Sequence, residues 1–112
     1  MSKPSILTAI PVRRYKFGEF TLTVLGDIET QDEVNYRYIL AVVQGGNPEP
    51  GLYLTAELGA GEDLAMRVMM RDGDQVIGHS SDWRELDIFV DESIKIVSQV
   101  LNLSDETPYQ LM

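Results

Sequence analysis

The 112-residue sequence contains no cysteine and a single histidine, His79. The lack of cysteine excludes disulfides, thiolate nucleophiles and cysteine metal sites, and it fits a reducing compartment. No run of residues approaches the roughly 20 apolar positions that span a bilayer, and residues 1–8 lack the apolar core of a secretory signal. We therefore expect a cytoplasmic protein that does not bind a membrane.

Basic residues are also scarce, because nine lysines and arginines face eighteen aspartates and glutamates and leave a net charge of −9. Since Lys and Arg supply most of the affinity for phosphate, this acidic balance argues against general nucleic-acid binding. Hydrophobic residues make up 44% of the chain, which is ordinary for a globular protein. We expect one domain spanning residues 1–112, with flexible tails at 1–8 and 104–112.

The longest helical pattern lies in residues 82–102, where apolar side chains recur at about 100° per residue. Asp82, followed by Glu85 three residues later, has the spacing of a capping box, so the helix is predicted to begin near Trp83. One apolar face predicts packing against a sheet. That face contains Trp83, Leu86, Phe89, Val90, Ile94, Ile96, Val97, Val100 and Leu101.

Six segments before this helix have the composition and alternation of strands, namely residues 10–17, 20–25, 34–43, 52–58, 64–71 and 75–79. Gly18 and Glu19 predict a two-residue turn that pairs Phe17 with Phe20. Residues 34–43 carry apolar side chains on both sides, which suits a central strand. The predicted fold is α+β, an antiparallel, meander-type sheet of about six strands with one long C-terminal amphipathic helix packed on one face.

No group of residues predicts catalysis. His79, Ser80 and Asp82 lie close together in the sequence, but a catalytic triad depends on hydrogen-bond geometry that adjacency does not provide. Strand parity places His79 on the same side of the sheet as Met66 or Val68, where it would rim the core. The sequence therefore favours a non-enzymatic protein.

No metal or cofactor site is predicted either. Residues 72–74, Asp-Gly-Asp, begin like a calcium-binding loop. The twelfth position of that loop would have to be glutamate, and here it is Trp83. A hairpin turn explains these residues better.

The predicted outer face of the sheet, away from the helix, gathers five of the nine basic residues around apolar side chains. Exposed apolar area rimmed by charge is typical of an interaction surface. We predict a small soluble interaction or adaptor domain whose partner at this face is a second copy of the chain or an acidic protein. By strand parity the face holds Arg14, Lys16, Arg37, Ile39, Val43, Tyr53, Arg67, Met69 and Arg71.

Two other functions compete with this interpretation. One is a small-ligand-binding domain with a pocket between helix and sheet, where polar side-chain tips meet an apolar cleft. The residues predicted for that pocket are Tyr36, Tyr38, His79 and Trp83. The other is a small enzyme that uses His79 with Ser80 or Asp82. The interaction domain is preferred because it requires no residue that the sequence lacks.

Overall fold

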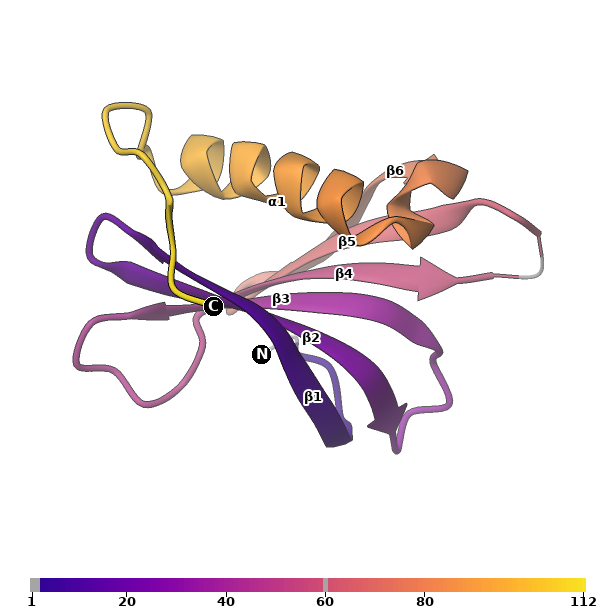
Figure 1. The fold of residues 1–112 in the computed structure, drawn as a ribbon. Helices are drawn as coiled ribbons and strands as arrows, with labels where there is room; N and C mark the ends of the chain where they lie inside the picture. The colour runs from indigo at the N-terminus through magenta and orange to yellow at the C-terminus, as the bar shows by residue number, and fades with distance from the viewer. Residues whose placement is uncertain (1–2, 60) are drawn as a thin grey trace.

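The computed structural model describes residues 3–59 and 61–112, which form one antiparallel sheet with a helix lying on one of its faces (Figure 1). Within these residues there are seven strands: β1 (Ile6–Phe17), β2 (Phe20–Thr30), β3 (Tyr36–Gln44), β4 (Leu52–Leu58), β5 (Leu64–Met70), β6 (Gly73–Ser80) and β7 (Tyr109–Gln110). A 3₁₀ helix (Ser81–Arg84) leads into α1 (Leu86–Val100). The predicted α+β class is confirmed, with slightly more strands than expected.

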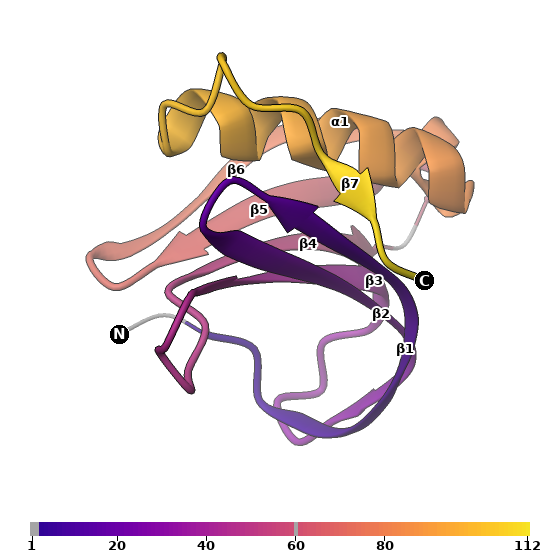
Figure 2. The same cartoon turned by 60° about the vertical axis from the view of Figure 1, so that its left-hand side comes forward.

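The sheet is a meander with the order β6-β5-β4-β3-β2-β1-β7, so β3 is its central strand as predicted. After β6 the chain is at one edge of the sheet. Helix α1 carries it back across the sheet to the opposite edge, where β7 pairs antiparallel with β1 (Figure 2). Among the described strands, the helix is therefore the only connection that crosses over several other strands of the sheet.

The β1–β2 hairpin has the predicted register. Phe17 lies opposite Phe20, and Tyr15 lies opposite Leu22. Gly18 at the turn has φ +59°, a left-handed conformation that glycine adopts without steric cost. Because a two-residue turn determines which residues face each other, this register could be derived from the sequence.

The core lies between α1 and the facing side of the sheet. Phe89 and Val97 on α1 are fully buried, and the ring of Phe89 stacks on Tyr38 of β3 with centroids 5.5 Å apart. Burying each such apolar side chain contributes roughly 1.5–3 kcal/mol. The core residues are Phe17, Leu22, Val24, Leu40, Val42, Leu52, Leu54, Ala56, Leu64, Met66, Phe89, Val90 and Val97.

The α-helix begins at Leu86, and the predicted start near Trp83 is wrong. The hydroxyl of Ser80 accepts a hydrogen bond of 3.1 Å from the backbone N–H of Asp82, so Ser80 caps a separate 3₁₀ turn. Glu85 then has extended backbone angles, which interrupt the helix before α1 starts. Asp82 is consequently not the N-cap of α1. The N-cap is Glu85, and its side chain makes no capping hydrogen bond.

The two predicted tails both contribute to the sheet. Strand β1 already begins at Ile6, and β7 lies within residues 104–112. The backbone N–H of Leu111 donates to the carbonyl of Arg14 at 2.7 Å, because the edge of β1 offers backbone groups that need partners. Residues 6–8 and 109–110 of the predicted tails therefore belong to strands, and positions 1 and 2 lie outside the described residues.

Candidate functional site

The predicted outer interaction face is not an exposed apolar surface. Ile39 is fully buried and Met69 is 7% exposed, while Val43 and Tyr53 are half-buried. The register of β1 against β2 is irregular at three places, and such bulges bend strands. In Figure 2 the segment before β1, the start of β1 and the end of β2 curl to the side of the sheet away from α1.

Arg67, which was predicted to meet an acidic partner across a contact, is paired within its own sheet. Its Nε lies 2.8 Å from Glu57 Oε1 on β4, and its NH1 lies 2.6 Å from Asp74 Oδ1 on β6. The hydrogen bond with Glu57 is the main cause that raises the pKa of Arg67 above its usual value. Neighbouring strands therefore supply the counter-charge that the sequence assigned to a partner.

Arg37 is directed toward the helix layer rather than the outer face. The β3–β4 register is irregular between Tyr36 and Tyr38, so Arg37 is an extra residue in the strand. Its Nε donates to the backbone oxygen of Arg84 at 3.3 Å, and its guanidinium lies 5.0 Å from the centre of the Tyr38 ring. The other predicted basic residues are all exposed, with two on β1 and one beside the β5–β6 turn: Arg14, Lys16 and Arg71.

The four residues of the predicted ligand pocket lie on opposite faces of the sheet. Tyr38 packs on Phe89 on the helix side. Trp83 also lies there, because a Cβ atom added to Gly78 would come within 3.3 Å of its ring. Both aromatic rings serve as packing around the core.

Tyr36 and His79 face away from the helix. Tyr36 lies opposite Glu57, and His79 lies opposite Ala65 rather than on the side of Met66, so the predicted side for His79 is wrong. The cause is the unpaired Ile77, which shifts the parity of β6 by one residue. His79 is exposed there.

The hydroxyl of Tyr36 has a raised pKa. Burial raises the pKa of Tyr36 to about 12, and the negative charges of Asp32 and Glu57 act in the same direction. A free tyrosine, with a pKa of about 10, is already neutral at physiological pH, so this shift extends the neutral form to more alkaline solution.

An apolar groove of about 590 Å³ runs between the β5–β6 hairpin and the C-terminal half of α1. Met70, Ile77 and Val100 line it and are 37%, 44% and 41% exposed. Strand β6 is the outermost strand, so among the described residues no strand pairs with its outward N–H and C=O groups. The groove thus combines exposed apolar area with an open sheet edge.

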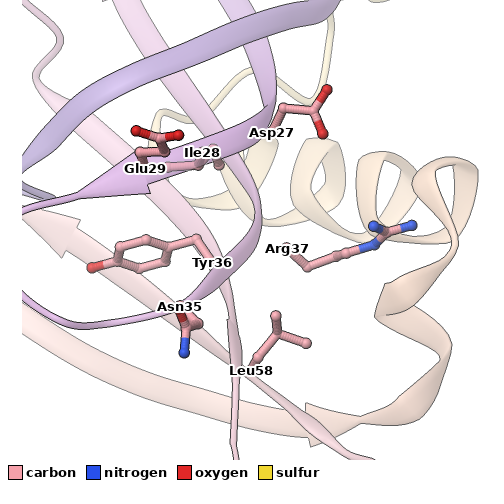
Figure 3. A pocket seen from close by; sticks show the side chains of 7 residues that line it. All are labelled: Asp27, Ile28, Glu29, Asn35, Tyr36, Arg37 and Leu58. Atoms are coloured by element: carbon pink, nitrogen blue, oxygen red, sulfur yellow. The ribbon is translucent and has the colours of Figure 1, made fainter.

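A second cavity, of about 420 Å³, lies between the C-terminal part of β2 and the start of β3. Residues 27–29 and 35–37, together with Leu58, line it (Figure 3). Most of these side chains are polar or charged, in contrast to the groove. The two sites involve different strands and different chemistry.

The groove was not predicted from the sequence, because the residues of β6 were assigned to the two faces of the sheet by alternation alone. One sequence signal was present, since the last strand of a meander is necessarily an edge strand until something else pairs with it. The cavity had a weaker signal, the Gly26-Asp27 pair within an otherwise regular strand pattern. Neither signal reveals which side chains line the sites.

Thr55 gives a test of the buried outer face. Its side chain is fully buried, and its hydroxyl has no hydrogen-bond partner among the described residues. Thr55→Val removes an unsatisfied polar group at nearly constant volume, so we expect it to raise the free energy of unfolding by about 1 kcal/mol in urea denaturation. Thr23→Val, on the half-buried Thr23, is the control and should change stability less. A destabilised Thr55→Val variant would contradict this description of the face.

Searches against protein-family models, curated proteins and solved structures find no match to this chain. Among residues 3–59 and 61–112, no group of three or more His, Asp or Glu side chains is arranged to hold a metal ion. The same residues include no helix that is long and apolar enough to cross a membrane.

Proposed function

We propose that the protein is a small, non-enzymatic interaction domain that binds an extended segment of a partner protein along β6. The observation that supports this is the apolar groove beside an open sheet edge. An added strand would satisfy the outward backbone groups of β6, and its alternate side chains would fill the groove. This mode of binding needs no catalytic or cofactor group.

The charge of the groove favours a basic partner segment. Its two charged lining residues, Asp72 and Asp74, are both acidic, and the whole chain carries a net charge of −9. Asp74 already pairs with Arg67, so Asp72 at the β5–β6 turn is the stronger attraction. Apolar residues alternating with lysine or arginine are the complementary sequence.

Self-association is the competing proposal. Two copies paired through β6 would also close the edge, but each brings the same acidic charge to the contact. Self-association through the outer face, or an acidic partner there, has weaker support because Ile39 and Met69 are already covered within the subunit. We therefore favour a basic strand from a different protein.

The proposal is tested with a synthetic octapeptide of alternating valine and lysine, whose binding is followed by fluorescence anisotropy. We expect Ile77→Gln to weaken binding about tenfold or more, because Ile77 is 44% exposed in the groove. Ile88→Gln is the matched control, since Ile88 is 43% exposed on α1 and does not line the groove.

Two further measurements separate the alternatives. An octapeptide of alternating valine and glutamate should not bind, because its charge repels Asp72. Equal affinity of the parent protein and Ile77→Gln for the lysine peptide would refute the groove. Sedimentation of the parent as a dimer that Ile77→Gln dissociates would assign the groove to a second copy instead.

A further inference from the structure

The two edges of the sheet differ in what lies beside them. Among the described residues, β6 has no strand on its outer side, whereas β1 is paired there with β7 (Figure 2). The contact is short, because β7 pairs only with Tyr15 and Lys16. A backbone bond of 2.7 Å extends it to Arg14, whose carbonyl accepts from the N–H of Leu111. The C-terminal segment, residues 109–112, thus covers one short part of the β1 edge.

The C-terminal segment buries none of its side chains. Tyr109, Leu111 and Met112 are 68%, 50% and 48% exposed, and Gln110 is exposed as well. Burial of apolar area therefore does not explain why the segment lies beside β1. It satisfies backbone N–H and C=O groups at an edge that would otherwise offer them to another strand.

The rest of the β1 edge is protected in another way. The register of β1 with β2 is irregular at three places between Ile6 and Arg13, and such bulges twist an edge strand away from a partner. Pro11 lies in this part and has no N–H to donate. Between Arg13 and Phe17 the register is regular, and β7 pairs within this part. The C-terminal segment therefore covers the part of β1 that is best suited to a further strand.

Strand β6 of a second copy fits this edge in its direction. Each strand from β1 to β6 is antiparallel to the one before it, so β6 runs opposite to β1. A second copy placed beside the first in the same orientation would bring its β6 antiparallel to β1 and continue the sheet. A head-to-tail contact of this kind leaves a free edge at each end, so further copies can add.

The two edges also carry opposite charges. Strand β1 contains no acidic residue and three basic ones, namely Arg13, Arg14 and Lys16. Strand β6 contains Asp74 and no lysine or arginine, and the turn before it adds one charge of each sign, from Arg71 and Asp72. Charge thus favours pairing of β6 with β1 over pairing of two β6 strands.

Arg14 and Asp74 lie at opposite ends of one row of cross-strand partners, so they share a face of the sheet. In the head-to-tail arrangement this row would place Arg14 of one copy beside Asp74 of the next. Asp74 already pairs with Arg67 at 2.6 Å, and a carboxylate can accept from more than one donor. The row consists of Arg14, Thr23, Ala41, Tyr53, Met69 and Asp74.

We propose that the edge of β1 is a binding surface for β6 of a second copy, and that β7 keeps this surface closed in the single subunit. The backbone groups of Arg14 that β7 occupies are among those that the added strand would need. With β7 in place, each copy has one closed edge and head-to-tail assembly is prevented. The inference rests on the open β6 edge of the proposed function and assigns it a second occupant.

Leu111→Pro in the full chain tests the proposal, because proline removes the N–H that donates to the Arg14 carbonyl. In sedimentation velocity we expect the mean mass to rise with concentration to about twice the subunit mass or more, while the parent stays monomeric. Leu111→Ala is the matched control, since it keeps the N–H and removes only an exposed side chain. It should stay monomeric.

A chain that ends at Pro108 lacks β7 altogether and should assemble at least as strongly as Leu111→Pro. It loses no buried side chain, so its circular dichroism should retain the helix and sheet signal of the parent. If the parent binds the valine–lysine peptide but this shorter chain stays monomeric, only the present inference fails. If the shorter chain assembles but the parent does not bind the peptide, only the proposed partner segment fails.

Arg14→Glu, made in the chain that ends at Pro108, locates the contact. It should abolish assembly, because the new carboxylate would lie beside Asp74 of the next copy. Lys95→Glu makes the same change of charge at an exposed position on α1 and should leave assembly unchanged. The proposal is overturned if the chain that ends at Pro108 stays monomeric at about 100 µM, or if Arg14→Glu assembles as strongly as that chain does.

Discussion

Val97→Asp is expected to unfold the protein, and circular dichroism should show a loss of both helix and sheet signal at room temperature. Val97 is fully buried on the face of α1 that packs against the sheet. A carboxylate at this position would have no partner and no water, and such a group costs several kcal/mol. Domains of this kind are stable by only about 5–15 kcal/mol in total.

Lys95→Asp is the matched control for this experiment. Lys95 lies two residues earlier on the same helix, and its side chain is exposed. The same introduced residue should therefore change the free energy of unfolding by less than about 1 kcal/mol. Equal melting temperatures for the two variants would show that the buried face of α1 has been assigned to the wrong residues.

Ile39→Asp is expected to have a comparably large effect from the opposite side of the sheet. Ile39 is fully buried on central strand β3, although it faces away from α1. Had this residue been part of an exposed contact surface, its substitution would leave a folded subunit and change only association. The structure instead predicts loss of the folded state, measured by thermal melting and by sedimentation at the same protein concentration.

Ile10→Asp controls for placing an acidic residue in a strand. Ile10 is 52% exposed on β1, so its replacement should leave the fold intact. If Ile39→Asp folds normally and merely dissociates a dimer, the outer face is a contact surface after all. That result would restore self-association through this face as the preferred function.

Local rules were sufficient for a large part of the fold. The turn at Gly18 placed Phe17 opposite Phe20, because a two-residue connection leaves no freedom in the register. The apolar side of residues 82–102 correctly identified Phe89 and Val97 as buried, since helical period and burial are directly linked. The meander with a final helix followed from the number and spacing of the strand patterns.

Parity failed wherever a strand contains an extra residue. Arg37 in β3 and Ile77 in β6 each shift the pattern by one position, which reverses the faces of Tyr36 and His79 relative to the prediction. The residues on either side of a bulge still alternate, so the bulge itself is not recognised from one sequence. The predicted pocket was therefore divided between two faces.

The sequence by itself determined the elements, the hairpin register and the buried face of the helix, because each depends on neighbours within a few residues along the chain. The tertiary structure alone decided which faces are exposed. Ile39 is fully buried although it faces away from α1, and Arg67 is paired because Glu57 and Asp74 lie on adjacent strands. The residues that line the groove beside β6 and the cavity between β2 and β3 likewise depend on how distant segments are placed relative to one another.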